Sequence, residues 1–291
     1  MRAFATKRIR SWKAFYKFAL RLNSPAPFKE RGWVFRGQTD DWPLRTSIER
    51  KLHDWNIPLA EATSIEYQTV REFRRRLREP QYQRVHDDTL FCLALMQHYG
   101  APTRLLDCTY SPFVAAAFAL EKGFACSKPV VWCIWGQWCG EQAKNCSAYD
   151  RRLIERRNND DQRSDATFVP LFQFGLRPKA TTSKFVKPEN PLHLNDRLTT
   201  QQGVFLCPAD LSASFEDNLK AMSGFDAETN LVKLTLELNK TNAIEFARNL
   251  RNMNVSFASL FSGLEGFARS LGQQITHFHE LAKGQAGIGG V

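Results

Sequence analysis

The side chains of this chain that could take part in chemistry gather in three short strings. Residues 35–38 read FRGQ, residues 97–112 read QHYGAPTRLLDCTYSP, and residues 201–206 read QQGVFL. Each string places polar or charged side chains beside an apolar segment. Because a lone buried charge is costly, the arginines and the aspartate of these strings must either form internal pairs or contact a ligand.

The sequence contains none of the standard catalytic templates. It has no P-loop, no G-x-S-x-G, no H-E-x-x-H and no G-x-G-x-x-G, so a hydrolase or a metalloenzyme has little support. The six histidines are scattered, and the seven cysteines form no C-x-x-C pair. The sequence therefore predicts no metal site and favours reduced thiols.

Composition sets the class of protein and of partner. The chain has 291 residues, of which 43% are hydrophobic, and no apolar run approaches the roughly 20 residues of a membrane span. The basic N-terminal stretch lacks the apolar core and cleavage site of a secretion signal. We therefore expect a soluble cytoplasmic protein without a membrane partner. The net charge of +10 favours polyanionic partners, whether nucleic acid or phosphorylated small molecules.

The second string also fixes local structure. Gly100 stands where a helix C-cap glycine belongs, and residues 103–107 predict a short buried strand. Ser111-Pro112 predicts an N-cap followed by proline at the first position of a helix that ends near residue 120. Gly203, in the third string, indicates close backbone approach or a positive φ.

Periodicity along the rest of the chain predicts an α+β fold, a small central mixed β-sheet surrounded by helices. Strands are expected at 33–35, 129–135, 204–206 and 231–238, and helices at 11–22, 60–78, 89–98, 241–253 and from about 263 to 281. We expect an N-terminal helical segment at 1–30, a domain at 31–272 with a polar insertion at about 141–167, and a C-terminal helix end with a flexible tail at 273–291.

The first two strings resemble the bacterial FRG domain family, named for its Phe-Arg-Gly motif. The H-Y-G-x-P-T-R-L-L-D-x-T-x-S-P block of residues 98–112, followed by an Ala/Phe-rich helix, carries most of the resemblance. It continues through the third string and extends over roughly Gly32 to Leu271.

A weaker resemblance is to ADP-ribosyltransferases of the arginine–serine–glutamate type. It implies a catalytic set consisting of Arg36, Thr109, Ser111, Gln201 and Gln202, and an NAD-binding set consisting of Arg36, Gly37, Gln38, Thr103, Arg104 and Asp107. In that interpretation Arg36 contacts the dinucleotide phosphate, Gly37 leaves room for the ligand, and Thr109 and Ser111 hold the nicotinamide ribose.

One position departs from the transferase pattern. Gly203 stands where that family has its glutamate, and the neutral amides of Gln201 and Gln202 stabilise a developing cation far less than a carboxylate does. Either another acid (Asp107, Asp196 or Glu216) takes the role, or the fold binds a nucleotide without this chemistry.

The resemblances together imply an intracellular effector that binds a nucleotide, NAD, and transfers ADP-ribose to protein or nucleic acid or cleaves NAD, in a toxin or phage-defence role. Purely structural roles stay open for the same residues. Arg36 could pair with Asp107, Arg104 could pair with Asp107, and Thr109 and Ser111 could be turn and cap residues.

The alternative function is that of a non-catalytic, basic nucleic-acid-binding module. Its candidate residues follow one another on the helix predicted at 60–78 and are joined by the insertion at 141–165. They are Arg71, Arg74, Arg75, Arg76 and Arg78. The sequence indicates no oligomeric state.

Overall fold

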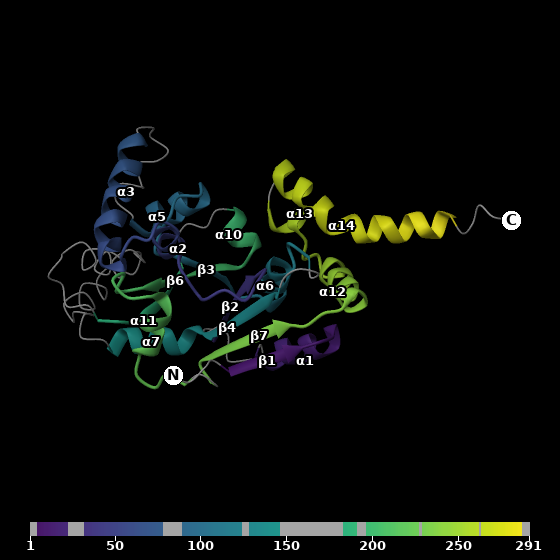
Figure 1. Ribbon diagram of the computed structural model, residues 1–291, viewed down its shortest axis with the longest axis horizontal. Helices are drawn as coiled ribbons and strands as arrows, with labels where there is room; N and C mark the ends of the chain where they lie inside the picture. Colours follow the sequence, from purple (N-terminus) through teal and green to yellow (C-terminus); the bar gives the residue numbers. More distant parts are fainter. Residues whose placement is uncertain are drawn as a thin grey trace, which may run out of the picture.

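The computed structural model describes residues 5–22, 32–77, 89–123, 128–145, 183–190, 196–226, 229–261 and 263–286. Over these residues the chain forms one seven-stranded mixed sheet with helices on both faces (Figure 1). The predicted α+β class, with a mixed sheet inside a shell of helices, is confirmed. None of the described helices is both long enough and apolar enough to span a membrane.

The sheet has the strand order β1-β7-β4-β2-β3-β6-β5. Only the pair of β1 with β7 is parallel, and the other neighbours are antiparallel. The strands are β1 (Ala5–Ile9), β2 (Trp33–Gln38), β3 (Leu106–Thr109), β4 (Val130–Trp135), β5 (Val186–Glu189), β6 (Gly203–Pro208) and β7 (Leu231–Leu236).

One face of the sheet is covered by α7 (Gly136–Asn145) and α11 (Phe215–Lys220). Val34, Trp132 and Leu206 from the sheet pack there against Trp138 of α7 and Phe215 of α11. We call this side the α7 face.

The opposite side, here called the α6 face, carries more helices. They are α1 (Trp12–Leu22), α6 (Pro112–Ala119), α12 (Lys240–Asn252) and α13 (Phe257–Leu260), with α3 (Ala62–Arg76) and α5 (Thr89–His98) packed beside β6. The remaining helices are α2 (Ser47–Asp54), the 3₁₀ turn η1 (Leu59–Glu61), α10 (Asp196–Thr200) and the long α14 (Gly263–Ala286).

Several local predictions are confirmed. Gly100 has a φ of 83° after α5, the Ser111 side chain accepts from the amide of Val114, and Pro112 opens α6. The strand predicted at 103–107 begins only at Leu106, because the backbone of Thr103 bonds to α2 instead of to a neighbouring strand.

The first and last parts of the chain hold further differences. Residues 5–9 form β1, an edge strand of the central sheet, in a segment expected to be helical, and β5 was not predicted. Residues 141–145 of the expected insertion belong to α7, whereas its remainder lies outside the described residues. The end of the predicted flexible tail also lies outside the described residues, whereas the first residues of that tail belong to α14.

Gly37 lets the sheet and α6 approach each other. A Cβ atom added to Gly37 would lie 1.9 Å from the carbonyl oxygen of Ala115 and 2.8 Å from the amide of Ala119. The space beside Gly37 is therefore filled by the backbone of α6, and it is not the room for a ligand that the sequence suggested. The alanines of α6 permit the same close contact from the other side.

Replacing Gly37 by alanine should destabilise the fold. The clash is with backbone atoms, so strands or helix must shift, and overpacking of this kind costs about 1–3 kcal/mol or more. Gly140→Ala is the matched control, because its added Cβ would meet only Pro188 Cδ at 4.0 Å. In a helix that change should gain up to about 1 kcal/mol. Equal unfolding free energies for the two variants in denaturant titrations would contradict this account of Gly37.

Candidate functional site

Arg104 of the second string is part of the interior. Its side chain and that of Glu66 on α3 are both fully buried and form an ion pair. Arg104 Nε donates to Glu66 Oε2 at 2.8 Å, and the Arg104 backbone amide donates to Glu66 Oε1 at 3.1 Å. The alternative that Arg104 pairs with Asp107 is wrong. Burial lowers the pKa of Arg104, but the Glu66 carboxylate more than offsets this and leaves the pKa above its ordinary value.

Thr103 joins three elements. Its amide donates to Ser47 Oγ at 2.8 Å, and its carbonyl accepts from the amide of Ile48 at 3.0 Å. Its hydroxyl donates to the side chain of Gln97 on α5. Thr103 is fully buried, so its polar atoms serve to seat the first turn of α2.

Thr109, Ser111 and Gln201 brace the α6 face. Thr109 Oγ1 donates to the carbonyl of Gln201 at 2.7 Å and accepts from the amide of Ser111 at 3.0 Å. The Gln201 side chain donates to the carbonyl of Leu260 at 3.1 Å. Thus the side chains expected to hold the nicotinamide ribose have their hydrogen bonds within the fold.

The turn before β6 contains the position of the missing glutamate. The positive φ, 48°, belongs to Gln202, while Gly203 allows close approach of Leu198. A Cβ at Gly203 would lie 2.6 Å from Leu198 Cδ2, so a glutamate there would have to displace that side chain. The exposed Gln202 bonds through its carbonyl to the amide of Tyr110 at 2.9 Å.

Arg36 lies among other charges at the junction of β2, β3 and α2. Its Nη1 donates to the backbone carbonyl of Asp107 at 2.6 Å, and its Nε is buried with no hydrogen-bond partner. Arg50 of α2 lies near enough that its pKa is lowered, first by burial and then by the charge of Arg36, while Asp107 opposes the shift. Arg36 is thus bound to the Asp107 backbone, and the charges of Arg36 and Asp107 both act on Arg50.

Strand register divides the predicted site into two parts. Phe35 and Thr109 are direct partners, as are Thr109 and Gly203, so these residues lie on the α6 face. Arg36 alternates with Phe35 and lies on the α7 face, as does Gln38, which accepts from Trp132 Nε1 at 2.9 Å. The three strings are therefore neighbours in the sheet, but their side chains do not line one cleft.

Sequence reasoning did not identify Arg50. It follows Arg36 by 14 residues in a short helix, and nothing in its sequence context distinguishes it from other surface arginines. Tertiary contacts, among them those of Thr103 with Ser47 and Ile48, place α2 beside Arg36.

The arginines of α3 serve several different contacts. Arg74 Nη2 donates to Thr89 at 3.1 Å, and Arg75 forms an ion pair with Glu72. Arg71 and Arg76 are exposed, and Arg78 lies outside the described residues. A nucleic-acid-binding role for these arginines stays a prediction.

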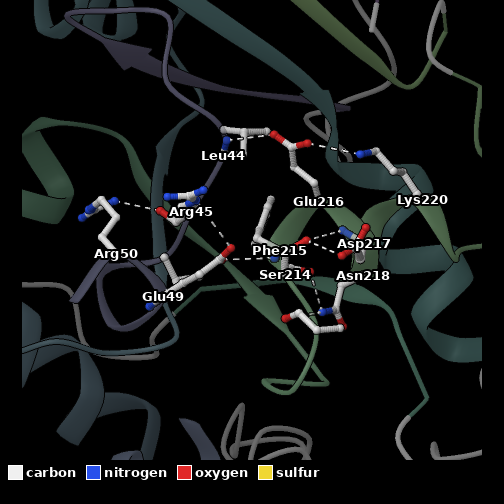
Figure 2. Close-up of polar contacts among 12 residues, drawn as sticks. Leu44, Arg45, Glu49, Arg50, Ser214, Phe215, Glu216, Asp217, Asn218 and Lys220 are labelled. Carbon is white, nitrogen blue, oxygen red and sulfur yellow. Dashed lines mark hydrogen bonds and ion pairs between the residues drawn. The ribbon is translucent and has the colours of Figure 1, made fainter. Parts of the chain in front are cut away.

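A pocket of about 420 Å³ lies between α2 and α11. Figure 2 shows two contacts made by glutamates that line it: Glu49 Oε2 accepts from the amide of Phe215 at 3.2 Å, and Glu216 Oε1 accepts from the amide of Leu44 at 3.1 Å. Lys220 bonds to the second oxygen of Glu216. Because both glutamates are engaged in this way, they fasten α2 to α11, and Glu216 is not a free acid for catalysis.

No His, Cys, Asp and Glu side chains in the described part of the chain cluster in a way that could hold a metal ion. The five described cysteines are buried free thiols, as the sequence predicted. Burial raises the pKa of the Cys108 and Cys207 thiols to about 12, so neither is a nucleophile near neutral pH.

The fold places the chain in the α+β class, and one family comparison goes further. The family model of the FRG domain matches residues 31–127, about a third of the chain, which confirms that resemblance for the first two strings. The match extends from the start of β2 past α6. No curated protein and no solved structure matches the chain. The resemblance to ADP-ribosyltransferases stays a prediction.

Arg36 and Asp107 should behave as weakly coupled sites in a stability cycle. The bond goes to the Asp107 backbone carbonyl, which Asp107→Asn retains. The coupling between Arg36→Ala and Asp107→Asn in the double variant should therefore not exceed the roughly 1 kcal/mol of an exposed charge pair. Rescue of Arg36→Ala by Asp107→Asn in urea titrations would instead show a carboxylate partner.

Glu49 should make stability depend on pH. Burial raises its pKa above the ordinary 4.5, although its bonds to Phe215 and Thr46 and the charge of Arg45 oppose the shift. A raised folded-state pKa favours the folded protein below the unfolded value, and this contribution is lost as pH rises through the folded pKa.

Glu49→Gln removes the titration but keeps an acceptor for the Phe215 amide. Relative to the unmodified protein, the variant should gain stability in denaturant titrations as the pH rises above about 4.5, and this gain should level off once Glu49 is ionised in the folded protein. Glu245→Gln, an exposed change on α12, is the control and should show no such gain. A gain that shrinks as pH rises would contradict the assignment.

Proposed function

We propose that this protein binds a phosphorylated nucleotide, NAD, with a phosphate group held between Arg36 and Arg50. The observation that carries the proposal is the buried Nε of Arg36, which has no hydrogen-bond partner although its neighbour Nη1 is held by Asp107. A buried donor without an acceptor costs about 1–3 kcal/mol, so a site that retains one is suited to a ligand that supplies the acceptor.

The charges favour an anion at this place. Two guanidinium groups close together repel each other, as the lowered pKa of Arg50 reflects after the effect of burial. A phosphate group between them would relieve that repulsion and accept from both planar forks. The bond from Arg36 to the Asp107 carbonyl holds one fork in place before the ligand arrives.

The choice of NAD, and a role as a toxin or phage-defence effector, come from the resemblance. The residues present suit a phosphate group but not the glutamate of the transferases, because Gly203 has no side chain and Leu198 fills the adjacent space. Asp107 is the exposed carboxylate beside the arginines. We therefore propose nucleotide binding as the activity. ADP-ribosyl transfer or NAD cleavage is a second, separate proposal, which an assay for nicotinamide release tests.

Titration calorimetry with NAD, ADP-ribose and inorganic phosphate tests this proposal. Arg36→Gln and Arg50→Gln should each weaken NAD binding by about tenfold or more, as expected for loss of a charge-assisted hydrogen bond. Arg248→Gln makes the same charge change at an exposed position of α12 and should leave affinity unchanged. Absence of nucleotide binding by the folded, unmodified protein would overturn the proposal.

Variants of the α3 arginines, compared with Arg36→Gln and Arg248→Gln, distinguish nucleotide binding from the alternative function, nucleic-acid binding. If the protein binds nucleic acid through α3, replacing the exposed Arg71 and Arg76 by glutamine should weaken DNA or RNA binding and reduce its salt dependence. Arg36→Gln should then have no larger effect on that binding than Arg248→Gln. Release of nicotinamide, measured in parallel, would add the catalytic function to nucleotide binding.

A further inference from the structure

Helix α14 presents an apolar stripe to solvent. Leu264, Phe267, Leu271 and Ile275 are exposed by 81%, 52%, 39% and 65% and follow one another at intervals of three, four and four residues. This spacing places them on one side of the helix. Figure 1 shows α14 extending away from the sheet. Large side chains in such an arrangement are typical of a helix that packs against a partner.

The opposite side of α14 fixes the direction of the stripe. Gly266 is buried, and a Cβ there would lie 2.1 Å from the carbonyl oxygen of Phe261. Arg269 forms an ion pair with Glu121 and lies over the rings of Phe257 and Phe261, at 4.9 and 4.4 Å from their centres. The first turns of α14 therefore cannot rotate to bury the stripe against their own domain.

We propose that this stripe binds the same helix of a second copy of the chain, so that the protein forms a dimer through α14. The sequence repeats in heptads, with Leu264, Phe267, Leu271 and Gln274 at the two seam positions. A face with this repeat is complementary to itself, as a two-fold interface requires.

The length of α14 supports pairing. It has 24 residues, and its main packing partner within the described chain is the four-residue helix α13. A helix that projects into water is only marginally stable without packing along its apolar side. Three heptads, about 30 Å of helix, give a second copy enough length to supply that packing.

Charge favours a second copy over an anionic surface. Within α14, Glu265 and Glu280 balance Arg269 and Lys283, although the whole chain carries +10. A neutral helix is not drawn to anionic lipid or to nucleic acid, which bind helices with an excess of lysine and arginine. A neutral helix also does not repel the same helix of a second copy, whereas the rest of the chain carries the net positive charge and does repel a second copy.

Sedimentation velocity of the full chain at about 1–100 µM, followed by light scattering, tests the proposal. The unmodified protein should be dimeric, and Phe267→Glu with Leu271→Glu should make it monomeric. Leu20→Glu places the same charge on another exposed leucine, on α1, and should leave the dimer intact. Gln274→Leu places an apolar side chain at a seam position and should tighten the dimer. This variant tests the interface without removing any packing contact.

Three results would overturn the proposal: a monomer at every concentration, a dimer that survives the double glutamate change in a folded protein, or a dimer that Gln274→Leu weakens. Binding of the monomeric protein to vesicles of phosphatidylcholine with phosphatidylserine, lost in the double variant, would assign the stripe to a membrane surface instead. Circular dichroism and thermal melts check that each variant is folded.

Discussion

The buried ion pair between Arg104 and Glu66 is the interaction on which the rest of this arrangement depends. Both side chains are fully buried, so loss of either would leave an uncompensated charge in the interior. The pair fixes the segment before β3 against α3, and Thr103, the residue preceding Arg104, then seats α2 through Ser47 and Ile48. Helix α2 in turn carries Arg50 to Arg36 and Glu49 to the amide of Phe215. A contact in the core thus positions charges at the surface.

This order of dependence explains why the second string is mostly scaffold. Thr103, Arg104, Thr109 and Ser111 all use their side chains in bonds within the fold. Arg36 differs, because it is only partly buried and forms no ion pair within the described part of the chain, and the charge of Arg50 acts nearby. The region that can meet a ligand is smaller than the combined strings, and it lies where β2, β3 and α2 meet.

Local signals in the sequence predicted much of the fold. Gly100 and Ser111-Pro112 mark helix ends through backbone geometry that neighbouring residues decide, and the apolar run at 130–135 could only be a central strand. The edge strands β1 and β5 could not be predicted in this way, since Lys7 and Arg8 are exposed and β5 contains Pro188. The neighbours of Arg104 and Arg36 could not be predicted either, because Glu66 is distant from Arg104 and Arg50 from Arg36 in the sequence. Only tertiary packing brings them close.

The most direct test of the proposed nucleotide site observes the Arg36 Nε–H group itself. Arginine Nε–H signals can be followed by ¹H–¹⁵N NMR, and Arg36→Lys identifies the one that belongs to Arg36. On addition of NAD this signal should move as its proton gains a phosphate acceptor, while the signal of the exposed Arg248 stays in place. An Arg36 signal that does not change at saturating NAD would contradict the account.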